Sequence, residues 1–332
     1  MRKNFAENRG IPLFVNPKAD LPAREGAAID SWYVISNFES EGEQLGFMWH
    51  QQIIDAGPAG RFLTAEFLLM NGNRNIWSNN SIGVPVSLAA GADRERLNVY
   101  SPLGALTGDA GRMELKLHVD EGALDVVLTP KKEVLCNGTT GLLKFMGGID
   151  SYQFSFPNMD IEGSFTLRGK TCRIEKTTAW FDRQWGFEGN PNTVGGTGMN
   201  KPAWLWLGMT LNEDSRRAIS LWDCYGKDGR FAFATVLNAN GTQVNAAAEV
   251  TYDRIWTSEK SGNSYPYEVH IAVPSEDLQM NLTAVIDKPE FSREGNDIAG
   301  CQSFCRVAAS YQGNPIDRYV ILEMVGDLCG EA

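Results

Sequence analysis

The chain has 332 residues, of which 43% are hydrophobic and 21% charged, and its formal net charge is −11. This composition is ordinary for a globular protein with a buried core, and the length allows two domains or one large all-β unit. The acidic balance argues against nucleic acid or anionic membranes as partners, because those surfaces attract lysine and arginine.

No targeting or membrane-spanning segment is visible. Residues 1–10 lack the apolar stretch of a secretory signal, and the chain has no apolar run long enough to cross a bilayer. The six cysteines are scattered, without the paired spacing of a zinc site. We therefore expect a cytoplasmic protein with reduced thiols, no membrane span and no metal site.

The predicted elements of the first half are short strands. Residues 1–27 are polar and proline-containing, and we expect them to form an N-terminal arm on the surface. Strands are expected in segments that alternate apolar and polar residues between turn signals. These segments are 30–38, 45–54, 62–70, 113–119, 124–128 and 151–156, the last of them ended by Pro157.

The second half repeats this pattern. Strands are expected at 163–167, 170–174, 177–186, 204–211, 218–225, 231–237, 246–252, 267–273, 280–286, 305–311 and 317–324. The glycine-rich run at 189–199 is read as a linker or as a loop over a site. So many strands, with glycine, asparagine and aspartate turns and no helical periodicity, predict antiparallel sandwiches or barrels in two β-rich domains.

The segment 177–186 is the first candidate for a functional site. Alternation along a strand places Trp180 and Asp182 on one face, and Phe181 and Arg183 on the other. A carboxyl group beside a large aromatic ring loses hydration, which raises its pKa and suits it to general acid catalysis. The alternative is a core strand whose Asp182 forms a salt bridge or caps a turn.

His50 is the second candidate. In its strand Phe47, Trp49 and Gln51 share one face, while Met48, His50 and Gln52 share the other. A histidine among apolar residues and amides could act as a general base or as a donor to a substrate. A histidine that is simply satisfied in the core or at its rim is the alternative.

An aromatic cluster is the third candidate. Trp204 and Trp206 share a face, and Trp222 is expected to pair across the following hairpin. Such a cluster can line a pocket for an apolar ligand or belong to the core. Asp223 lies next to Trp222 and could be a second acid.

Several motifs are missing from the sequence. It has no Gly-x-Ser-x-Gly elbow, no P-loop, no strand-linked Gly-x-Gly-x-x-Gly and no His-Glu-x-x-His. The residues therefore indicate no redox cofactor, nucleotide or catalytic metal.

At these segments the chain resembles the lipocalin-like AttH family, which includes carotenoid 1,2-hydratase, kievitone hydratase and fungal Diels–Alderases. The strongest piece is Ala-Trp-Phe-Asp-Arg-Gln-Trp-Gly at 179–186, similar to the family's Ala-Trp-x-Asp-x-x-Trp-Gly. The other pieces are the Trp-Tyr and Gly-Phe strands at 31–50, the segment 147–157, the Trp-x-Trp strand at 204–211, and the ends at 265 and 323–326. The family often has histidine where this chain has Arg183, and a tryptophan where it has Ser31.

The resemblance implies two lipocalin-like antiparallel β-barrel domains, at 28–190 and 200–327, with a hydrophobic pocket near their junction. It also implies cofactor-free chemistry on a C=C bond of a hydrophobic small molecule such as a terpenoid or polyphenol. By position Asp182 corresponds to the family's proposed proton donor, and Trp180 could stabilise a carbocation.

We thus expect a hydratase, lyase or isomerase with Asp182 and His50 as catalytic residues. The expected substrate-binding residues are Trp49, Tyr152, Trp180, Arg183, Trp185, Trp204 and Trp206. Two alternatives remain: a carrier of a hydrophobic ligand without chemistry, and a Diels–Alderase-type cyclase that acts by shape.

Overall fold

The computed structural model describes residues 6–7, 13–145, 149–187, 203–211, 216–226, 229–292 and 299–329. Within these ranges the regular structure is β-strand, apart from the short 3₁₀ turns η1 (Gly57–Ala59), η2 (Asn137–Thr139) and η3 (Pro274–Glu276). No helix among the described residues has the length and hydropathy that a membrane crossing requires.

The chain folds into two compact units. The N-terminal unit consists of Phe14–Val134 and Asp150–Asn190, and the C-terminal unit of Met1–Leu13, Leu135–Ile149 and Pro191–Ala332. Residues 135–149 thus group with the C-terminal unit, whereas the expected boundaries included them in the first domain. The glycine-rich run at 189–199 lies outside the described residues.

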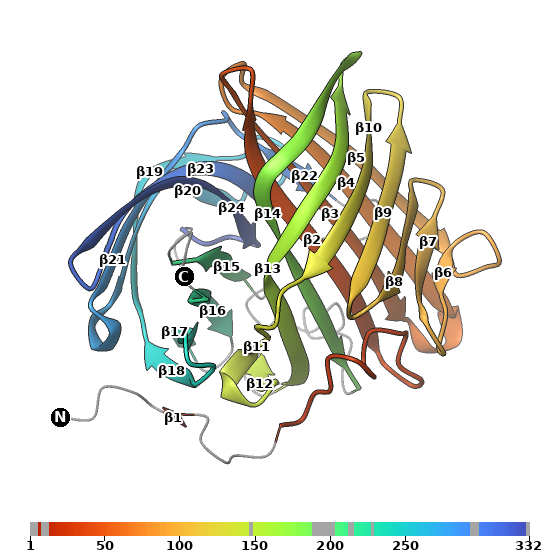
Figure 1. The fold of residues 1–332 in the computed structure, drawn as a ribbon, viewed down its shortest axis with the longest axis horizontal. Helices are drawn as coiled ribbons and strands as arrows, with labels where there is room; N and C mark the ends of the chain where they lie inside the picture. The colour runs from red at the N-terminus through yellow and green to blue at the C-terminus, as the bar shows by residue number, and fades with distance from the viewer. Residues whose placement is uncertain are drawn as a thin grey trace. The chain divides into compact units, whose positions relative to one another are not determined.

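The N-terminal unit is built on one antiparallel sheet in the order β5-β4-β3-β2-β14-β13-β10-β9-β8-β7-β6. Its strands are β2 (Ile29–Ser40), β3 (Glu43–Asp55), β4 (Arg61–Asn71), β5 (Ile76–Pro85), β6 (Gly91–Ala92), β7 (Leu97–Ser101), β8 (Gly104–Asp109), β9 (Arg112–Val119), β10 (Gly122–Pro130), β13 (Ile149–Leu167) and β14 (Lys170–Gly186). Figure 1 shows this sheet curling, so that β7 to β10 lie opposite β3 to β5.

One side chain identifies the concave face of this curled sheet. Gln51 on β3 donates hydrogen bonds through Nε2 to the carbonyls of Gly91 and Tyr100, at 3.1 and 3.2 Å. These carbonyls lie on β6 and β7, which are remote from β3 in the strand order. Gln51, and Trp49 on the same side of β3, therefore point into the interior of the N-terminal unit.

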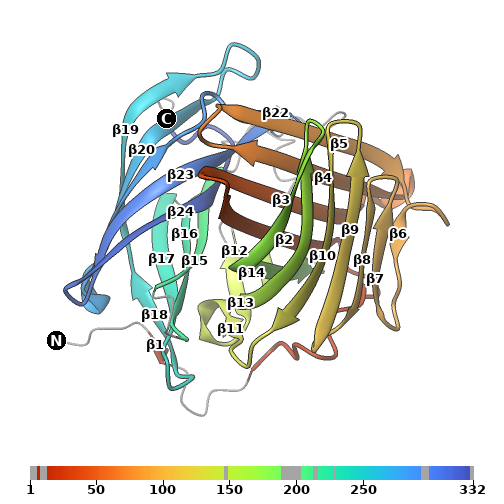
Figure 2. The ribbon, with the colours of Figure 1, turned by 45° about the horizontal axis from the view of Figure 1, so that its top comes forward.

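The C-terminal unit has a second antiparallel sheet in the order β1-β18-β17-β16-β15-β24-β23-β21-β20-β19, with β22 beside β23. Its strands are β1 (Ala6–Glu7), β15 (Ala203–Thr210), β16 (Ala218–Gly226), β17 (Gly229–Leu237), β18 (Gln243–Ala247), β19 (Glu249–Thr257), β20 (Ser264–Val273), β21 (Leu278–Ala284), β22 (Glu290–Ser292), β23 (Ala299–Tyr311) and β24 (Asn314–Val325); β11 (Leu135–Cys136) and β12 (Leu142–Phe145) also belong to this part of the chain. Figure 2 shows the curl of the sheet.

The two ends of this second sheet meet. Arg230 on β17 donates to the carbonyl of Val250 on β19 at 2.6 Å, and the amide of Ala248 donates to the carbonyl of Ala232 at 3.1 Å. The enclosed core contains Leu205, Leu221 and many other apolar side chains of the unit. Each unit is thus a curled antiparallel sheet, as the all-β prediction requires.

Strands β13 and β14 are longer than the sequence predicted. Pro157 was expected to end a strand, but β13 continues past it, and the pairing with β14 shifts register between Phe156 and Met159. A bulge leaves one residue without a ladder hydrogen bond, so a proline without an N–H is tolerated there. The segment 246–252, which was expected to form one strand, contains the end of β18 and the start of β19. Strands β5, β7 and β8 were not predicted from the sequence.

Candidate functional site

Asp182 lies on β14 of the N-terminal unit, on the face of the sheet opposite the concave one, and the residue is 5% exposed. The indole Nε1 of Trp180 donates a hydrogen bond to its Oδ1 at 2.8 Å. The hydroxyl of Ser155, on the neighbouring strand β13, donates a second, short hydrogen bond to the same oxygen. These two donors hold the carboxyl group in one orientation.

Strand register places a row of polar side chains beside Asp182. Antiparallel pairing puts Ser155, Asp182 and Tyr33 opposite one another, and Tyr33 in turn opposite His50. The row continues to Glu66 on β4, which is 2% exposed. Side chains directly opposite in an antiparallel sheet share a face, with their Cβ atoms about 4.5–5.5 Å apart. We call Ser155, Asp182, Tyr33, His50 and Glu66 the acidic row.

His50 is fixed within this row by two neighbours. Its Nε2 lies 2.8 Å from the hydroxyl oxygen of Ser31, and its ring meets that of Tyr33 edge-on at 5.5 Å between centroids. Two strand spacings separate His50 from Asp182, which is about 10 Å at 4.7–4.9 Å per strand. Tyr33 occupies the strand between them, so a group bridging Asp182 and His50 would pass the Tyr33 ring.

The acidic row lies between an apolar row and a polar row on the same face. On one side register aligns Trp180 with Ile35 and Met48. On the other side it aligns Gln184 with Ser31 and with Gln153. The face therefore changes from apolar to hydrogen-bonding across Asp182, which suits a molecule with a hydrophobic body and a polar end.

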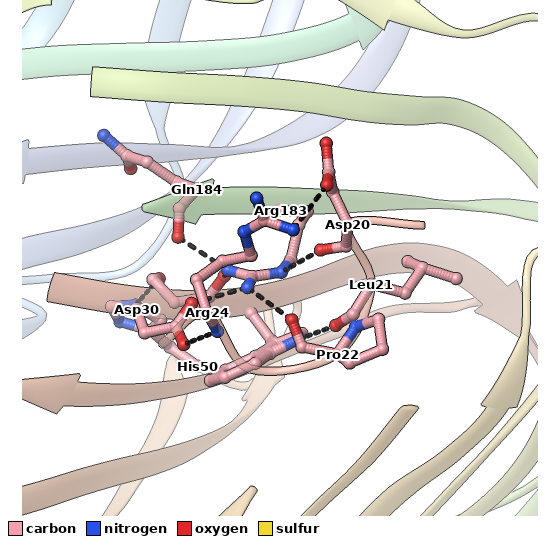
Figure 3. A network of polar contacts seen from close by, with 10 residues as sticks. Asp20, Leu21, Pro22, Arg24, Asp30, His50, Arg183 and Gln184 are labelled. Carbon is pink, nitrogen blue, oxygen red and sulfur yellow. Dashed lines mark hydrogen bonds and ion pairs between the residues drawn. The ribbon is translucent and has the colours of Figure 1, made fainter. Parts of the chain in front are cut away.

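Arg183 points away from Asp182, as alternation predicts, and is fully buried on the concave face. Figure 3 shows its guanidinium group among Asp20, Pro22 and Asp30. Its guanidinium group forms an ion pair with Asp30 at 2.5 Å and donates to the carbonyls of Asp20 and Pro22, each at 2.8 Å. It also lies over the Trp32 ring at 4.3 Å. Burial raises the pKa of the Asp30 carboxyl, against the opposing effect of the Arg183 charge.

Through these contacts Arg183 has a structural role, which is to hold the segment before β2 against the sheet. The segment that carries Asp20 and Pro22 belongs to the expected N-terminal arm, and the guanidinium group attaches it to the sheet. Burial itself lowers the pKa of Arg183, while Asp30 counteracts that effect. A desolvated cation of this kind is stable only with its acceptors in place.

Three other expected substrate-binding residues share the concave face with Arg183. Trp49 is fully buried there, beside Gln51 in the alternation of β3. Trp185 stacks on Tyr152 across the β13–β14 pair, with centroids 5.5 Å apart. The structure therefore brings Trp180 and His50 to the face of Asp182, and does not bring Trp49, Tyr152, Arg183 or Trp185 there.

Trp204 and Trp206 lie in the C-terminal unit on one face of β15. Trp204 donates through Nε1 to Oε1 of Glu323 at 2.8 Å, and Gln302 donates to the other carboxylate oxygen at 2.8 Å. Trp206 donates to the hydroxyl of Ser220 at 3.1 Å and lies 6.3 Å from the Trp222 ring. This unit thus also contains an indole-to-carboxylate hydrogen bond.

Asp223, the suggested second acid, lies on the opposite face of β16 from Trp222. It is fully buried and is held by Arg230 through two nitrogens, at 2.9 and 2.7 Å, and by the hydroxyl of Tyr252 at 2.5 Å. Burial and the Asp223 charge raise the pKa of Tyr252 far above its usual range. This arrangement closes the seam between β17 and β19.

Metal ligation receives no support from the described part of the chain, where no three His, Cys, Asp or Glu side chains gather in a metal-binding arrangement. All six cysteines are free thiols. Burial raises the pKa of Cys136 to about 11 and that of Cys305 to about 12, as expected for unreactive core thiols.

Four residues of these arrangements were not among the predicted site residues: Tyr33, Glu66, Ser155 and Glu323. Glu66 carried a local signal, because it is a single charged residue within the apolar run of β4. Ser155 and Tyr33 carried none, since only the pairing register brings them opposite Asp182. Glu323 was part of a quoted motif, but its role as an acceptor for Trp204 depends on β24 lying beside β15.

Comparison with known proteins identifies the family. A family model described as AttH-like matches residues 13–302. The dehydratase asqC of Emericella nidulans is 25% identical over 204 residues, which cover 58% of this chain and 54% of that protein. The chain thus spans about half the length of this curated relative.

Solved structures show the same fold. An AttH protein of Nitrosomonas europaea superposes with a TM-score of 0.78 at 19% identity, covering 95% of this chain and 97% of its own. Kievitone hydratase of Nectria haematococca superposes with a TM-score of 0.76 at 19% identity, covering 96% of this chain and 94% of its own. CghA, solved with Sch210972, superposes with a TM-score of 0.61 at 13% identity, covering 99% of this chain and 98% of its own. The expected all-β, lipocalin-like fold is confirmed, and since the family model covers most of the sequence, the chain belongs to the AttH-like family.

Proposed function

We propose that this protein is an acid–base hydro-lyase that adds water to, or removes it from, a C=C bond of a hydrophobic small molecule. The observation that carries the proposal is the setting of Asp182. The residue is 5% exposed, and its carboxyl group is oriented by Trp180 and Ser155 and lies where an apolar row meets a polar row. A terpenoid or a polyphenol has the matching character, with an apolar body and hydroxyl groups at one end.

In the hydration direction the protonated Asp182 transfers its proton to one alkene carbon, and the π electrons form the new C–H bond. A water molecule then adds to the other carbon, which carries the positive charge, and loses a proton to a base. We assign His50 as that base, with Tyr33 between it and the acid. The π face of Trp180, next to the carboxyl group, favours the cationic intermediate. Dehydration follows the same steps in reverse.

Two related proteins support this reaction class by their names. One is a dehydratase and the other kievitone hydratase, so both are named for the loss or gain of water. The likeness to kievitone hydratase rests on the fold, and the match to the dehydratase covers about half of that protein. The assignment of reaction and residues to this chain therefore depends on the acidic row.

We retain Trp180 as a substrate contact in the N-terminal unit, and Trp204 and Trp206 as a proposed aromatic ligand surface of the C-terminal unit. Acid–base participation of this kind contributes about 10²- to 10⁴-fold in rate. Asp182→Asn removes the transferable proton while keeping the shape of the side chain, so it should lower turnover by that factor with the fold intact.

The experiment is a turnover screen in ¹⁸O-labelled water. Prenylated phenols, terpenoid alkenes and the corresponding alcohols are incubated with the protein. Mass spectrometry follows the gain of one labelled water by an alkene, or the loss of one unlabelled water from an alcohol. Asp160→Asn, an exposed acid on β13 that pairs with Lys131, is the matched control. Turnover that survives Asp182→Asn undiminished would refute the acid role and point to a site that acts by shape. Substrates that bind and return unchanged would indicate a carrier.

A further inference from the structure

A cavity of about 210 Å³ opens at one end of the N-terminal unit, away from the acidic row. Its walls come from the ends of three hairpins: β2–β3, β4–β5 and β13–β14. The cavity includes Cys172, which lies about 30 Å from Asp182 along β14 at roughly 3.3 Å per residue. It is therefore a separate site from the one assigned to the chemistry.

The floor of this cavity is apolar. Leu45, Phe165 and Leu167 are nearly fully buried, and Ile76 is half-buried beside them. Phe165 is fixed from behind by the Phe38 ring, edge-on at 5.4 Å. A dry cavity of roughly 150 Å³ already admits benzene in an engineered protein. A space of this size thus fits a short alkyl chain.

The rim of the cavity is cationic, although the chain as a whole carries a net charge of −11. Arg74, Arg168 and Lys170 line it, against one acid, Glu43. Arg74 donates a hydrogen bond through Nε to the carboxylate of Glu43 at 2.5 Å, and Lys170 forms an ion pair with Glu41 at 2.8 Å. Within the described part of the chain, the guanidinium group of Arg168 has only a long ion-pair contact of 3.8 Å, to the exposed Glu121. The Lys170–Glu41 and Arg168–Glu121 pairs join exposed side chains and are weak, so an incoming anion can replace them.

A tight turn carries Arg168 at the edge of the cavity. Arg168 and Gly169 form the two-residue turn between β13 and β14, and both have positive φ, 49° and 80°. A two-residue hairpin turn requires this conformation, which also occurs at Glu41–Gly42 and Gln312–Gly313. The turn places the Arg168 side chain at the rim of the cavity.

We propose that this cavity binds a medium-chain aliphatic carboxylate. The alkyl chain lies on Leu45, Ile76, Phe165 and Leu167, and the carboxylate forms charge-assisted hydrogen bonds with Arg168, with Lys170 close by. The cavity is independent of the acidic row. Binding of the carboxylate therefore does not require catalytic turnover, and turnover does not require the cavity to be occupied.

The test uses octanoate as the probe and the full chain as it exists. Cys172 lines the cavity, and burial raises its pKa, so alkylation by iodoacetamide is followed at pH above 8 by peptide mass spectrometry. Octanoate should slow alkylation of Cys172 at least fivefold and leave Cys329, the other partly exposed thiol, unaffected. Octanol, of matched chain length but neutral, should bind about tenfold more weakly by titration calorimetry.

Two variants locate the binding. Arg168→Ala should weaken octanoate about tenfold and leave octanol unchanged, whereas Arg96→Ala, which removes an exposed arginine on another turn, should change neither. Cys172→Phe fills the cavity and should abolish binding of both probes. Asp182→Asn should bind octanoate like the wild type, which separates this site from the proposed reaction.

Three results would overturn the proposal. One is an unchanged alkylation rate of Cys172 at millimolar octanoate. Another is equal protection of Cys329, which would indicate general adsorption of a detergent-like molecule. The third is wild-type affinity for octanoate in both Arg168→Ala and Cys172→Phe.

Discussion

The indole nitrogen of Trp180 donates a 2.8 Å hydrogen bond to Oδ1 of Asp182, two residues further along β14 on the same face of the sheet. Residues at i and i+2 of a strand share a face, so this pair is set by the strand itself. The second donor, Ser155, comes from the next strand. A carboxyl group held from within its own strand and from a neighbour has little freedom to turn.

Trp180→Phe keeps an aromatic ring beside Asp182 but removes the donor. Because a hydrogen bond to a charged group contributes about 1.5–3 kcal/mol, we expect a loss of stability in that range when Asp182 is ionised. Urea unfolding measures it. Trp77→Phe is the matched control, since its buried Nε1 finds no hydrogen-bond partner in the described structure. Equal losses in the two variants would mean that the indole contributes only packing.

Arg183→Met should be among the most damaging single changes in the N-terminal unit. It leaves Asp30 buried without its cation, and breaking a buried pair costs about 3–5 kcal/mol. Arg24→Met removes a partly exposed partner of Asp20 and should cost about 1 kcal/mol or less.

The double variant Asp30→Asn/Arg183→Met tests the origin of that loss. With both charges removed, stability should recover partly towards the wild type, so the two single effects should not add. Denaturant midpoints of the four proteins provide the cycle. Strict additivity would show that the cost of Arg183→Met comes from its carbonyl contacts and not from the ion pair.

Arg230→Met tests the seam between β17 and β19. Asp223 is fully buried, so loss of its cation should cost about 2 kcal/mol, less than for a fully buried pair because Arg230 is partly exposed. Arg306 forms a similar two-nitrogen pair with Asp317, but both groups are exposed. Arg306→Met should therefore change the free energy of unfolding by less than about 1 kcal/mol. A smaller effect at Arg230 than at Arg306 would contradict this account.

His270 should titrate above its ordinary value of 6.5. A hydrogen bond with Asn281 and the neighbouring Asp253 carboxylate raise its pKa by favouring the imidazolium form. The folded state then binds the proton more tightly, so this contribution to stability is fully present below pH 6.5 and is lost as pH rises through the folded pKa. NMR titration of the ring protons measures the value, and Asn281→Ala should move it back towards 6.5. A pKa at or below 6.5 in the wild type would be a contrary result.

Alternation, spacing and turn chemistry were sufficient to predict much of this molecule from its sequence. They gave the all-β class, the divergence of Asp182 from Arg183, and the opposite directions of Trp49 and His50, because the period of a strand is a local property. The length of β13 was not predicted, since a bulge at Pro157 depends on pairing with β14.

Only the tertiary structure decided which side chains meet. Ser155, Tyr33, His50 and Glu66 align with Asp182 through the register of five strands, some of them far apart in sequence. Likewise, Arg183 finds Asp30 and the carbonyls of Asp20 and Pro22 only when the strand and the preceding segment are both in place. Register is fixed by the burial of whole strands and by turn geometry, and no short sequence window contains either.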